Sequence, residues 1–523
     1  MKRTNKHNTH KKIYISLISI SLFMMSFLYL FYFKDNFSVF NDQNKPEKKI
    51  TDYTINVHFL EKEKKLYGKE SINFFNNYNK PLNKLVFHLY AKGFNNKDTA
   101  PSIDQDFENS STDSLGNIKI KSVHIDNKSI NFTTNNQILK ISLTPLLKPK
   151  KNLKIDIDFE LTIPNGRDRL GYFNDQYSIT NWYPILSIFD EKTGTWDENS
   201  FYKIGESNHS SISNYCINLT VPKNMIVVSS GKTISETPNN ETKKLNIICS
   251  KSRDFVLFMS PYYKKISKKI NNTTINSYYL EYNKESEINK DKKGFILCPK
   301  YISQRLLSLC MNSFKYFNEK FGSYNYTELN IVESYLTGGA MEYPQVIQMG
   351  NYTRIPIRNY SLNEWLNTEN LICPLWIDEA IVHETAHQWW YSMVGNNEFK
   401  EPFLDESLAE FSTRMFFKKN YQNITRKKAI PALTKENFLT SPPISSSVNH
   451  FNNWRDYSQI IYNKGALLLE SLTEDLGEEK VFTILNEYFY EHKYKIATIK
   501  DFLDIVEKNS NKKIRKKLDL ILK

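Results

Sequence analysis

The sequence predicts an α+β multidomain protein in which an N-terminal antiparallel β-domain precedes an α/β domain with an α-rich C-terminal lobe. Three observations lead to this prediction. A length of 523 residues is enough for two or three domains with a large core. From Asp52 onward, apolar and polar residues alternate, as in Tyr53, Ile55, Val57 and Phe59, which is typical of strands with one buried face. In the second half, apolar residues recur with helical spacing instead.

Short apolar runs, separated by turns rich in Asn, Asp, Gly and Pro, predict the strands of the first domain. We expect these strands at residues 71–75, 85–90, 118–125, 153–161, 216–221, 225–229 and 255–259. The pattern changes near residue 263, so the β-domain should cover 52–263 and the second domain 264–523. In the second domain we expect a strand at 329–334, a loop at 439–447, and helices at 301–321, 460–476, 479–491 and 499–508.

The N-terminus has the pattern of a membrane anchor. Residues 1–12 contain five basic side chains, and residues 13–33 form a run of 21 residues without charge. At about 1.5 Å per residue this run is about 31 Å long, close to the thickness of a bilayer core. It ends in large aromatic residues rather than the small residues of a cleavage site, which favours an uncleaved signal anchor over a signal peptide or a buried helix.

This topology divides the N-terminal segment into a cytoplasmic basic tail (1–12), a transmembrane anchor (13–33) and a polar tether (34–51). The positive-inside rule leaves the N-terminus cytoplasmic and the rest of the chain outside a single-pass cell membrane.

The net charge of +13 fits a membrane neighbour or a solvated lysine-rich surface. Because the lysines are dispersed and no nucleic-acid motif occurs, we expect no nucleic-acid partner. The five cysteines form no C-x-x-C motif and are expected to be core residues.

The segment from Ile381 to Trp390 contains the motif H-E-x-x-H. On a helix, His383 and His387 project from one face and can bind one metal ion, with Glu384 beside the metal as a base for water. A catalytic zinc ion needs a third protein ligand and one open position, and an acidic segment follows at 403–411. The alternative is a surface helix with a salt-bridged glutamate. The apolar flanks, which include two tryptophans, predict a buried helix, in which a metal would satisfy the polar groups.

Three motifs together resemble the aminopeptidase N family of zinc metallopeptidases, which belongs to the thermolysin-like gluzincins and is related to leukotriene-A hydrolase. The first is HETAHQWW, with Glu406 following His387 after eighteen residues. The second, Gly-Gly-Ala-Met-Glu-Tyr-Pro at 338–344, is similar to the G-x-M-E-N exopeptidase motif. The third is Tyr-Asn-Lys-Gly-Ala at 462–466. The resemblance covers the chain from about Asp52 to its end and implies a thermolysin-like second domain.

The resemblance implies a role for each motif residue. His383, His387 and Glu406 would hold one Zn²⁺ per chain, Glu384 would be the general base, and Tyr462 would stabilise the oxyanion. Glu342, together with Gly339, Ala340 and Met341, would bind the N-terminal end of the substrate. Tyr343 stands where the family often has Asn. Asp405 either orients a histidine ligand through a hydrogen bond or is an exposed acid at a helix start.

These features together predict a membrane-anchored, zinc-dependent aminopeptidase that acts on peptides outside the cytoplasm. Two alternatives remain open. The same site could serve a zinc endopeptidase or another hydrolase, or the fold could have become a catalytically inactive peptide-binding protein. The intact set of His383, Glu384, His387, Glu406 and Tyr462 argues against the inactive alternative.

Overall fold

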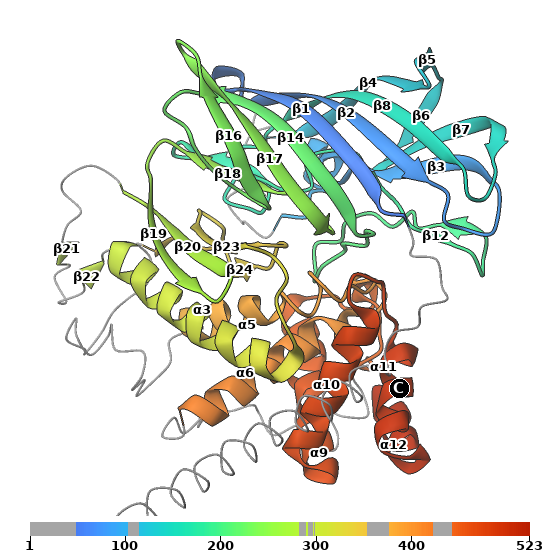
Figure 1. Cartoon of the computed structure of the whole chain (residues 1–523), viewed down its shortest axis with the longest axis vertical. Helices are drawn as coiled ribbons and strands as arrows, with labels where there is room; N and C mark the ends of the chain where they lie inside the picture. The colour runs from blue at the N-terminus through green and yellow to red at the C-terminus, as the bar shows by residue number, and fades with distance from the viewer. Residues whose placement is uncertain are drawn as a thin grey trace, which may run out of the picture. The chain divides into compact units, whose positions relative to one another are not determined.

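In the computed structural model, the alternation that begins at Asp52 forms an eight-stranded sheet with the order β16-β17-β14-β1-β2-β8-β4-β5 (Figure 1). The strands are β1 (Thr51–Leu60), β2 (Lys65–Phe75), β4 (Asn117–Ile125), β5 (Lys128–Ser129), β8 (Asn152–Thr162), β14 (Ser213–Pro222), β16 (Lys232–Pro238) and β17 (Thr242–Ser252). In β1, buried residues alternate with more exposed ones, as the sequence predicts.

The structure describes residues 49–102, 115–281, 289–290, 296–297, 299–352, 376–421 and 442–523. Residues 50–523 form one compact unit. The predicted basic tail, anchor and most of the tether, at 1–48, lie outside the described residues. Among the helices that are described, none combines the length and apolar character needed to span a bilayer.

The large sheet is not purely antiparallel, whereas the sequence predicts an antiparallel β-domain. All its neighbouring strands are antiparallel except β1 and β14, which run parallel with Thr51 opposite Ser213. A parallel pair needs a long crossover connection rather than a hairpin. Here the connection from β1 to β14 includes all strands of a four-stranded sheet ordered β11-β3-β7-β6 and two strands, β9 and β10, of a second one ordered β15-β18-β10-β9. Their strands are β3 (Leu82–His88), β6 (Phe132–Asn135), β7 (Ile138–Leu147), β9 (Gly171–Phe173), β10 (Gln176–Ile179), β11 (Ile185–Leu186), β15 (Ile226–Ser229) and β18 (Leu257–Ser260).

The second part of the chain begins with a five-stranded sheet ordered β19-β20-β23-β25-β24. Its strands are β19 (Tyr263–Ile270), β20 (Thr273–Leu280), β23 (Glu328–Glu333), β24 (Ala340–Met341) and β25 (Val346–Met349). Helix α3 (Pro299–Phe321) contacts β20 along one face of this sheet (Figure 1). Sheet membership therefore changes at Tyr263, and the domain division at 263/264 stays a prediction.

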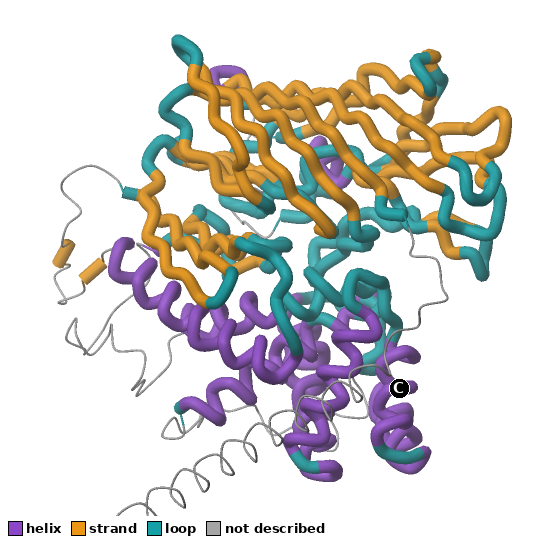
Figure 2. Tube along the Cα trace, viewed as in Figure 1, coloured by secondary structure: helices purple, strands orange, loops and turns teal. Residues whose placement is uncertain are grey.

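Helices make up most of the remaining regular secondary structure of the described chain, as Figure 2 shows. They are α5 (Trp376–Ala386), α6 (Glu406–Asn420), α8 (Trp454–Tyr457), the π-helix η8 (Ser458–Lys464), α9 (Gly465–Leu476), α10 (Glu478–His492), α11 (Ile499–Asn509) and α12 (Lys512–Leu522). The predicted helix at 460–476 is thus divided into a π-helix and an α-helix. The predicted loop at 439–447 is described from residue 442, where neither helix nor strand occurs.

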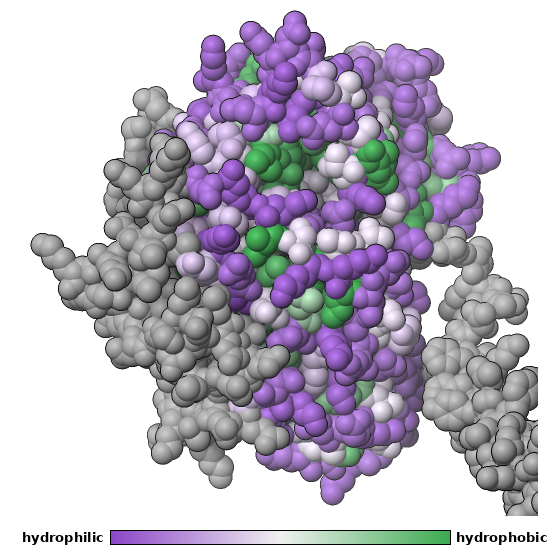
Figure 3. Space-filling view, turned by 60° about the vertical axis from the view of Figure 1, so that its left-hand side comes forward, coloured by the Kyte–Doolittle hydropathy of each residue, from purple (hydrophilic) through white to green (hydrophobic). Residues whose placement is uncertain are grey.

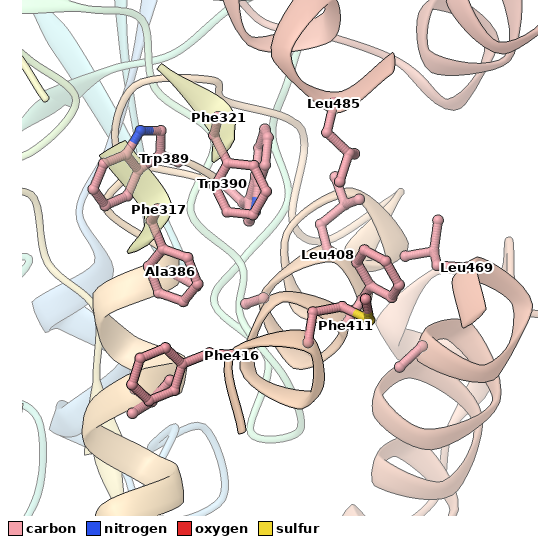
Figure 4. Packing of buried hydrophobic residues seen from close by; sticks show 14 of the residues in the cluster. Phe317, Phe321, Ala386, Trp389, Trp390, Leu408, Phe411, Phe416, Leu469 and Leu485 are labelled. Atoms are coloured by element: carbon pink, nitrogen blue, oxygen red, sulfur yellow. The ribbon is translucent and has the colours of Figure 1, made fainter. Parts of the chain in front are cut away.

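One hydrophobic core joins the helices of the second part. In Figure 4, aromatic and aliphatic side chains from α3, α6, α9 and α10 pack around the segment that follows α5. The labelled core residues are Phe317, Phe321, Ala386, Trp389, Trp390, Leu408, Phe411, Phe416, Leu469 and Leu485. The apolar flanks of H-E-x-x-H are therefore buried, which agrees with the buried helix that the sequence predicts.

The surface carries much of the positive charge. The face in Figure 3 is mostly hydrophilic, with apolar residues in separate groups. On the outermost strand β19, the exposed residues include Lys264, Lys265, Lys268 and Lys269. Lysines on an edge strand hinder pairing with another sheet. This placement supports the interpretation of a solvated lysine-rich surface.

A buried arginine connects the β-domain to the segment after α5. The guanidinium of Arg253 donates to the carbonyls of Tyr391 (2.7 Å), Ser210 (3.1 Å) and Lys495 (2.5 Å). Gly395 packs directly against it, because a Cβ at that position would lie 2.1 Å from the Arg253 Cζ atom. These bonds satisfy carbonyls that lie outside helices and strands, and they fix the β-domain against the segment that follows the H-E-x-x-H motif.

Candidate active site

Helix α5 positions the first histidine and ends before the second. Its N-terminal turn is held by a buried bidentate ion pair, in which Arg305 of α3 donates to both oxygens of Asp378, each at 2.7 Å. His383 lies in α5, whereas the helix ends at Ala386 and His387 occupies the following turn. The His387 N–H still donates to the His383 carbonyl at 3.2 Å. The expected one-turn spacing of the two rings is therefore kept, although His387 lies just beyond the helix on which the sequence predicts both histidines.

Two tryptophans fix this turn. The Trp389 indole N–H donates to the Gly322 carbonyl at 2.8 Å, and the Trp390 indole N–H donates to Ser412 Oγ at 3.0 Å. Both side chains are fully buried. Because buried indole groups need such partners, the Trp-Trp pair ties the end of the motif to α3 on one side and α6 on the other.

Three side-chain atoms converge as zinc ligands would. The Nε2 atoms of His383 and His387 are 3.0 Å apart, and Glu406 Oε2 lies 3.1 Å and 3.3 Å from them. Ligand atoms bound tetrahedrally at about 2.0–2.2 Å from one zinc ion are about 3.3–3.6 Å apart. The observed spacing and the donor set of two nitrogens and one oxygen fit this geometry, so the three predicted ligands lie together and can hold a zinc ion.

A second group of candidate ligands is formed by Glu342, Glu384 and His387. His387 Nδ1 faces the Trp390 carbonyl at 3.0 Å, which leaves only Nε2 for a metal. That nitrogen already belongs to the first group, so both groups cannot bind a metal through it at once. Two imidazoles make the first group the better zinc site.

The pKa values of the three candidate ligands are shifted because the ligands are buried and lie next to charged groups. Burial acts to lower the pKa of His383, but contacts with Glu406 and Glu410 outweigh it and raise that pKa to about 10. For His387, burial is likewise outweighed by Glu342 and Glu406, and its pKa is raised to about 9. Burial would raise the pKa of Glu406, yet the two histidines hold it well below its usual range. The negative charge of Glu406 is therefore available to a cation.

Glu384 is buried beside the ligands and has a free oxygen. Its Oε2 has no hydrogen-bond partner among the described residues. Burial, followed by repulsion from Glu342, raises the pKa of Glu384 well above its usual range. A carboxyl group in such surroundings has strong proton affinity, as a general base near neutral pH requires.

Asp405 lies at a helix start, as the second of the two alternatives expects, but it is not exposed as that alternative also expects. Its Oδ1 accepts the backbone N–H of Glu406 at 2.9 Å and caps the N-terminus of α6. The side chain is fully buried rather than exposed, and burial together with repulsion from Glu406 raises its pKa well above the usual range. Asp405 thus sets the start of the helix that carries Glu406.

The loop with Glu342 is fastened to the metal-binding segment by Gln388. Gln388 Oε1 accepts the Gln345 N–H at 2.9 Å, and its Nε2 donates to the Tyr343 carbonyl at 3.2 Å. Glu342 is buried and its Oε1 has no partner among the described residues. Burial raises the pKa of Glu342, while His387 acts in the opposite direction. The carboxylate is therefore held next to the metal ligands with one oxygen free.

The small residues of this loop leave space, and its larger ones fill the core. A Cβ at Gly339 would meet no atom within 4 Å, although the φ of +149° would strain any other residue. Ala340 and Met341 form β24, the edge strand opposite β19 in the five-stranded sheet. The side chains of Met341 and Tyr343 are buried in a hydrophobic cluster. Tyr343 therefore acts in packing.

Tyr462 lies next to the metal ligands. Its ring stacks on that of His383, with centroids 5.4 Å apart and an interplanar angle of 15°. It belongs to the π-helix η8, and π-helices frequently occur at functional sites. Burial, and then the negative charge of Glu406, raises the pKa of Tyr462 well above its usual range, so its hydroxyl stays protonated and can donate.

The sequence did not reveal that the β-domain contributes to this site. Buried Arg169 donates to Glu206 Oε1 at 2.7 Å, while Glu206 Oε2 has no partner among the described residues. Burial raises the pKa of Glu206 well above its usual range, Arg169 lowers it, and the negative charge of Glu342 raises it further, so these two glutamates influence each other electrostatically. A buried Arg-Glu pair so far from the motifs carries no local sequence signal.

Comparison with known families and proteins agrees with this geometry. Residues 306–520 match the Peptidase family M1 domain. Endoplasmic reticulum aminopeptidase 2 of Homo sapiens is 27% identical over 155 residues, which are 28% of this chain and 16% of that protein. Probable aminopeptidase 2 of Sulfurisphaera tokodaii is 27% identical over 145 residues, covering 26% of this chain and 19% of that protein. The matched stretches thus span less than a fifth of these relatives.

Solved structures share the fold over nearly the whole chain. The M1 zinc metallopeptidase from Deinococcus radiodurans aligns with a TM-score of 0.59 and 14% identity, covering 91% of this chain and 95% of that one. A mutant of the same Deinococcus protein, bound to a Tyr-Ser-Ala substrate, aligns with a TM-score of 0.57 and 13% identity, covering 91% and 94%. The predicted fold class, a β-domain followed by a partly helical domain, is confirmed, as is the resemblance to the aminopeptidase N family.

Zinc binding should release protons. Because the pKa values of His383 and His387 are raised to about 10 and 9, the zinc-free protein should hold protons on these rings at pH 7. Zinc binds neutral imidazole, so each zinc ion bound should displace at least one proton. Calorimetric titration of zinc in buffers of different ionisation enthalpy measures this number, and the apparent affinity should rise between pH 7 and 9.

The matched control is the exposed His450, whose replacement by Ala should change neither stoichiometry nor proton release. His383→Ala should abolish stoichiometric binding. Full zinc retention in His383→Ala, or binding without proton release, would contradict the ligand assignment.

Proposed function

From the peptidase family M1 domain in residues 306–520, we propose that this chain is a zinc-dependent aminopeptidase that removes N-terminal residues from peptides. One observation carries the proposal. The buried triad of His383, His387 and Glu406 lies beside Glu342 and Glu384, which both have an unpartnered oxygen among the described residues. A metal site, a base and a receptor for a substrate amine would thus be combined in one buried region, and we propose one zinc ion per chain.

His383, His387 and Glu406 would hold the zinc ion. When bound, it supplies Lewis acidity that lowers the pKa of water and polarises the scissile carbonyl. Glu384 is then the base that removes a proton from the attacking water and delivers it to the leaving amine. Its unpartnered Oε2 and its raised pKa support both steps, since the same group must accept and later release the proton.

Tyr462 would donate a hydrogen bond to the oxyanion that develops on the substrate carbonyl. A donor aimed at developing charge in a site without water is an effective means of lowering the barrier. Two observations support this role. The stacking of its ring on His383 holds the phenol next to the metal ligands, and its raised pKa keeps the hydroxyl proton in place.

Glu342 would receive the α-ammonium group of the substrate. A charge-assisted hydrogen bond of this kind contributes about 1.5–3 kcal/mol, and it fixes the cleavage point one residue from the N-terminus. The peptide backbone would run along β24, the outermost strand of its sheet, where the open space at Gly339 allows a close approach. The solved neighbour bound to a Tyr-Ser-Ala substrate supports peptides as the substrate class.

We also propose that the enzyme is anchored in the cell membrane with its N-terminus in the cytoplasm and its catalytic part outside. The support is the sequence of residues 1–33, with five basic residues followed by 21 uncharged ones. Protease treatment of intact cells should release a large fragment that retains activity. Protection of the catalytic part until the cells are lysed would overturn this orientation.

Glu384→Gln and Tyr462→Phe should separate catalysis from metal binding. The first variant keeps the side-chain shape but loses the base, so turnover should fall by about 10²–10⁴-fold. The second loses one donor, so kcat should fall by about 10²–10³-fold with little change in KM. Both should retain zinc, measured by metal analysis. Near-normal turnover of Glu384→Gln would assign the base to another group, and a change confined to KM would make Tyr462 a binding residue.

Glu342 should determine exopeptidase specificity. Acetylation of the substrate amine removes the charge that Glu342 attracts, so blocked peptides should be cleaved much more slowly than free ones. Glu342→Gln should reduce kcat/KM for free peptides by about 10–100-fold, equivalent to the about 1.5–3 kcal/mol of the lost bond, and should affect blocked peptides little. The measurement is a panel of paired free and acetylated fluorogenic peptides. Equal cleavage of both kinds at internal bonds by the unaltered protein would replace the aminopeptidase with a zinc endopeptidase.

A further inference from the structure

A carboxylate stands behind the first zinc ligand. Glu410 lies one turn after Glu406 on α6, and its Oε2 is 3.7 Å from His383 Nδ1. This is the side of the imidazole ring opposite Nε2, which faces Glu406 at 3.1 Å. The Glu410 side chain is only 18% exposed. His383 is therefore held between two carboxylates, one on each ring nitrogen.

A buried arginine holds this carboxylate and extends the contact to another helix. Arg414 lies one turn further along α6, and its Nε donates to Glu410 Oε1 at 2.7 Å. Its Nη2 donates to Asn463 Oδ1 at 2.9 Å and its Nη1 to Glu470 Oε1 at 3.3 Å. The Arg414 side chain is 5% exposed, whereas that of Glu470 is 36% exposed. Because Asn463 follows Tyr462 directly, the Arg414 guanidinium connects Glu410, which faces His383, to the segment that carries Tyr462.

A second contact fastens the same two helices on the other side of Tyr462. Ser407 Oγ donates to the Ile461 carbonyl at 2.6 Å. Gly465 packs on Ser407 so closely that a Cβ there would lie 2.0 Å from its Oγ atom. The π-helix is thus bonded to α6 at Ile461 and at Asn463, the two neighbours of Tyr462. Helix α6 carries Glu406, so its position fixes both the metal and the tyrosine.

The two histidines differ in the group behind them. His387 Nδ1 faces a neutral backbone carbonyl, that of Trp390, whereas His383 Nδ1 faces the charged Glu410. A carboxylate next to Nδ1 keeps the proton on that nitrogen, leaves the Nε2 lone pair free for a metal, and makes the ring a stronger ligand. Among the described residues, Glu410 is therefore the charged group that faces the Nδ1 atom of a histidine ligand and can hold its proton there.

We infer that Glu410 and Arg414 are positioning residues of the zinc site, and the inference rests on the proposed role of His383 as a zinc ligand. Glu410 selects the tautomer and orientation of His383. Arg414 holds Glu410 in place. Through its bond to Asn463, it also fixes the position of Tyr462 relative to the metal ligands. The arginine thereby couples the strength of metal binding to the placement of the oxyanion donor.

The test compares two substitutions, each of which replaces one of the two carboxylates that contact Arg414 by a neutral amide. Glu410→Gln removes the carboxylate that faces His383, and Glu470→Gln is the matched control, because Glu470 contacts Arg414 from its outer side. Zinc affinity is measured by competition with a chelator, and the melting temperature of each zinc-free variant checks its folding. Glu410→Gln should bind zinc about 10–100-fold more weakly than the unaltered protein, and Glu470→Gln should bind it equally well.

Equal zinc affinity of Glu410→Gln and the unaltered protein, or equal weakening in both variants, would overturn the role of Glu410. If the unaltered protein itself bound no zinc, the proposed function would fail instead, so the two failures are distinguishable. The absorption spectrum of the cobalt-substituted protein gives a second readout. It should change in Glu410→Gln, because the field of one nitrogen ligand changes, and should stay the same in Glu470→Gln.

Arg414→Lys tests the coupling to Tyr462. Lysine keeps the positive charge but lacks the planar fork that reaches Glu410 and Asn463 together. This variant should bind zinc more weakly and show a kcat lowered by about tenfold or more at saturating zinc, with KM close to that of the unaltered protein. Unchanged zinc affinity and kcat in Arg414→Lys would show that the arginine only stabilises α6.

Discussion

The buried negative charge around the metal ligands is the constraint on which the active-site region depends. Six carboxyl groups are buried there and influence one another: Glu206, Glu342, Glu384, Glu398, Asp405 and Glu406. Carboxylates cannot be gathered without water unless cations or protons compensate them. Among the described residues, Arg169 and the two histidines supply positive charge. A divalent cation held by the two histidines and Glu406 would supply more, and would then stabilise this region as well as serve the proposed reaction.

Buried polar bonds between separate elements keep this charged group in place. Arg305 holds the start of α5 through Asp378, Gln388 holds the Glu342 loop, and Arg253 holds the β-domain against the turn after His387. Each is a buried group whose partners lie on another element. Removing one partner would leave the other desolvated and unsatisfied, which costs more than the bond itself contributes. The region therefore resists small displacements, as catalysis by positioned groups requires.

The fold was largely predictable where local patterns decide it. Period-two alternation located β2, β4, β8 and β14, and helical spacing located α3, α10 and α11 to within a few residues. Three features escaped prediction for physical reasons. The parallel pairing of β1 with β14 joins segments more than 150 residues apart. The π-helix at Tyr462 arises where α6 bonds the backbone at Ile461. Helix α12 has only two buried side chains, Leu518 and Leu522, so its basic sequence gave little apolar signal.

The sequence by itself determined the chemistry of the site. The spacing of His383, Glu384 and His387, with Glu406 beyond, specifies a zinc site because one helical turn brings the side chains to one face, and the Glu342 and Tyr462 motifs mark the other groups. Only the tertiary structure decided what surrounds them. Glu206 of the β-domain and Glu342 influence each other electrostatically, Glu410 lies behind His383 because α6 packs against α5, and Arg414 connects Glu410 to Asn463. Such contacts depend on the packing of elements, and no local spacing encodes them.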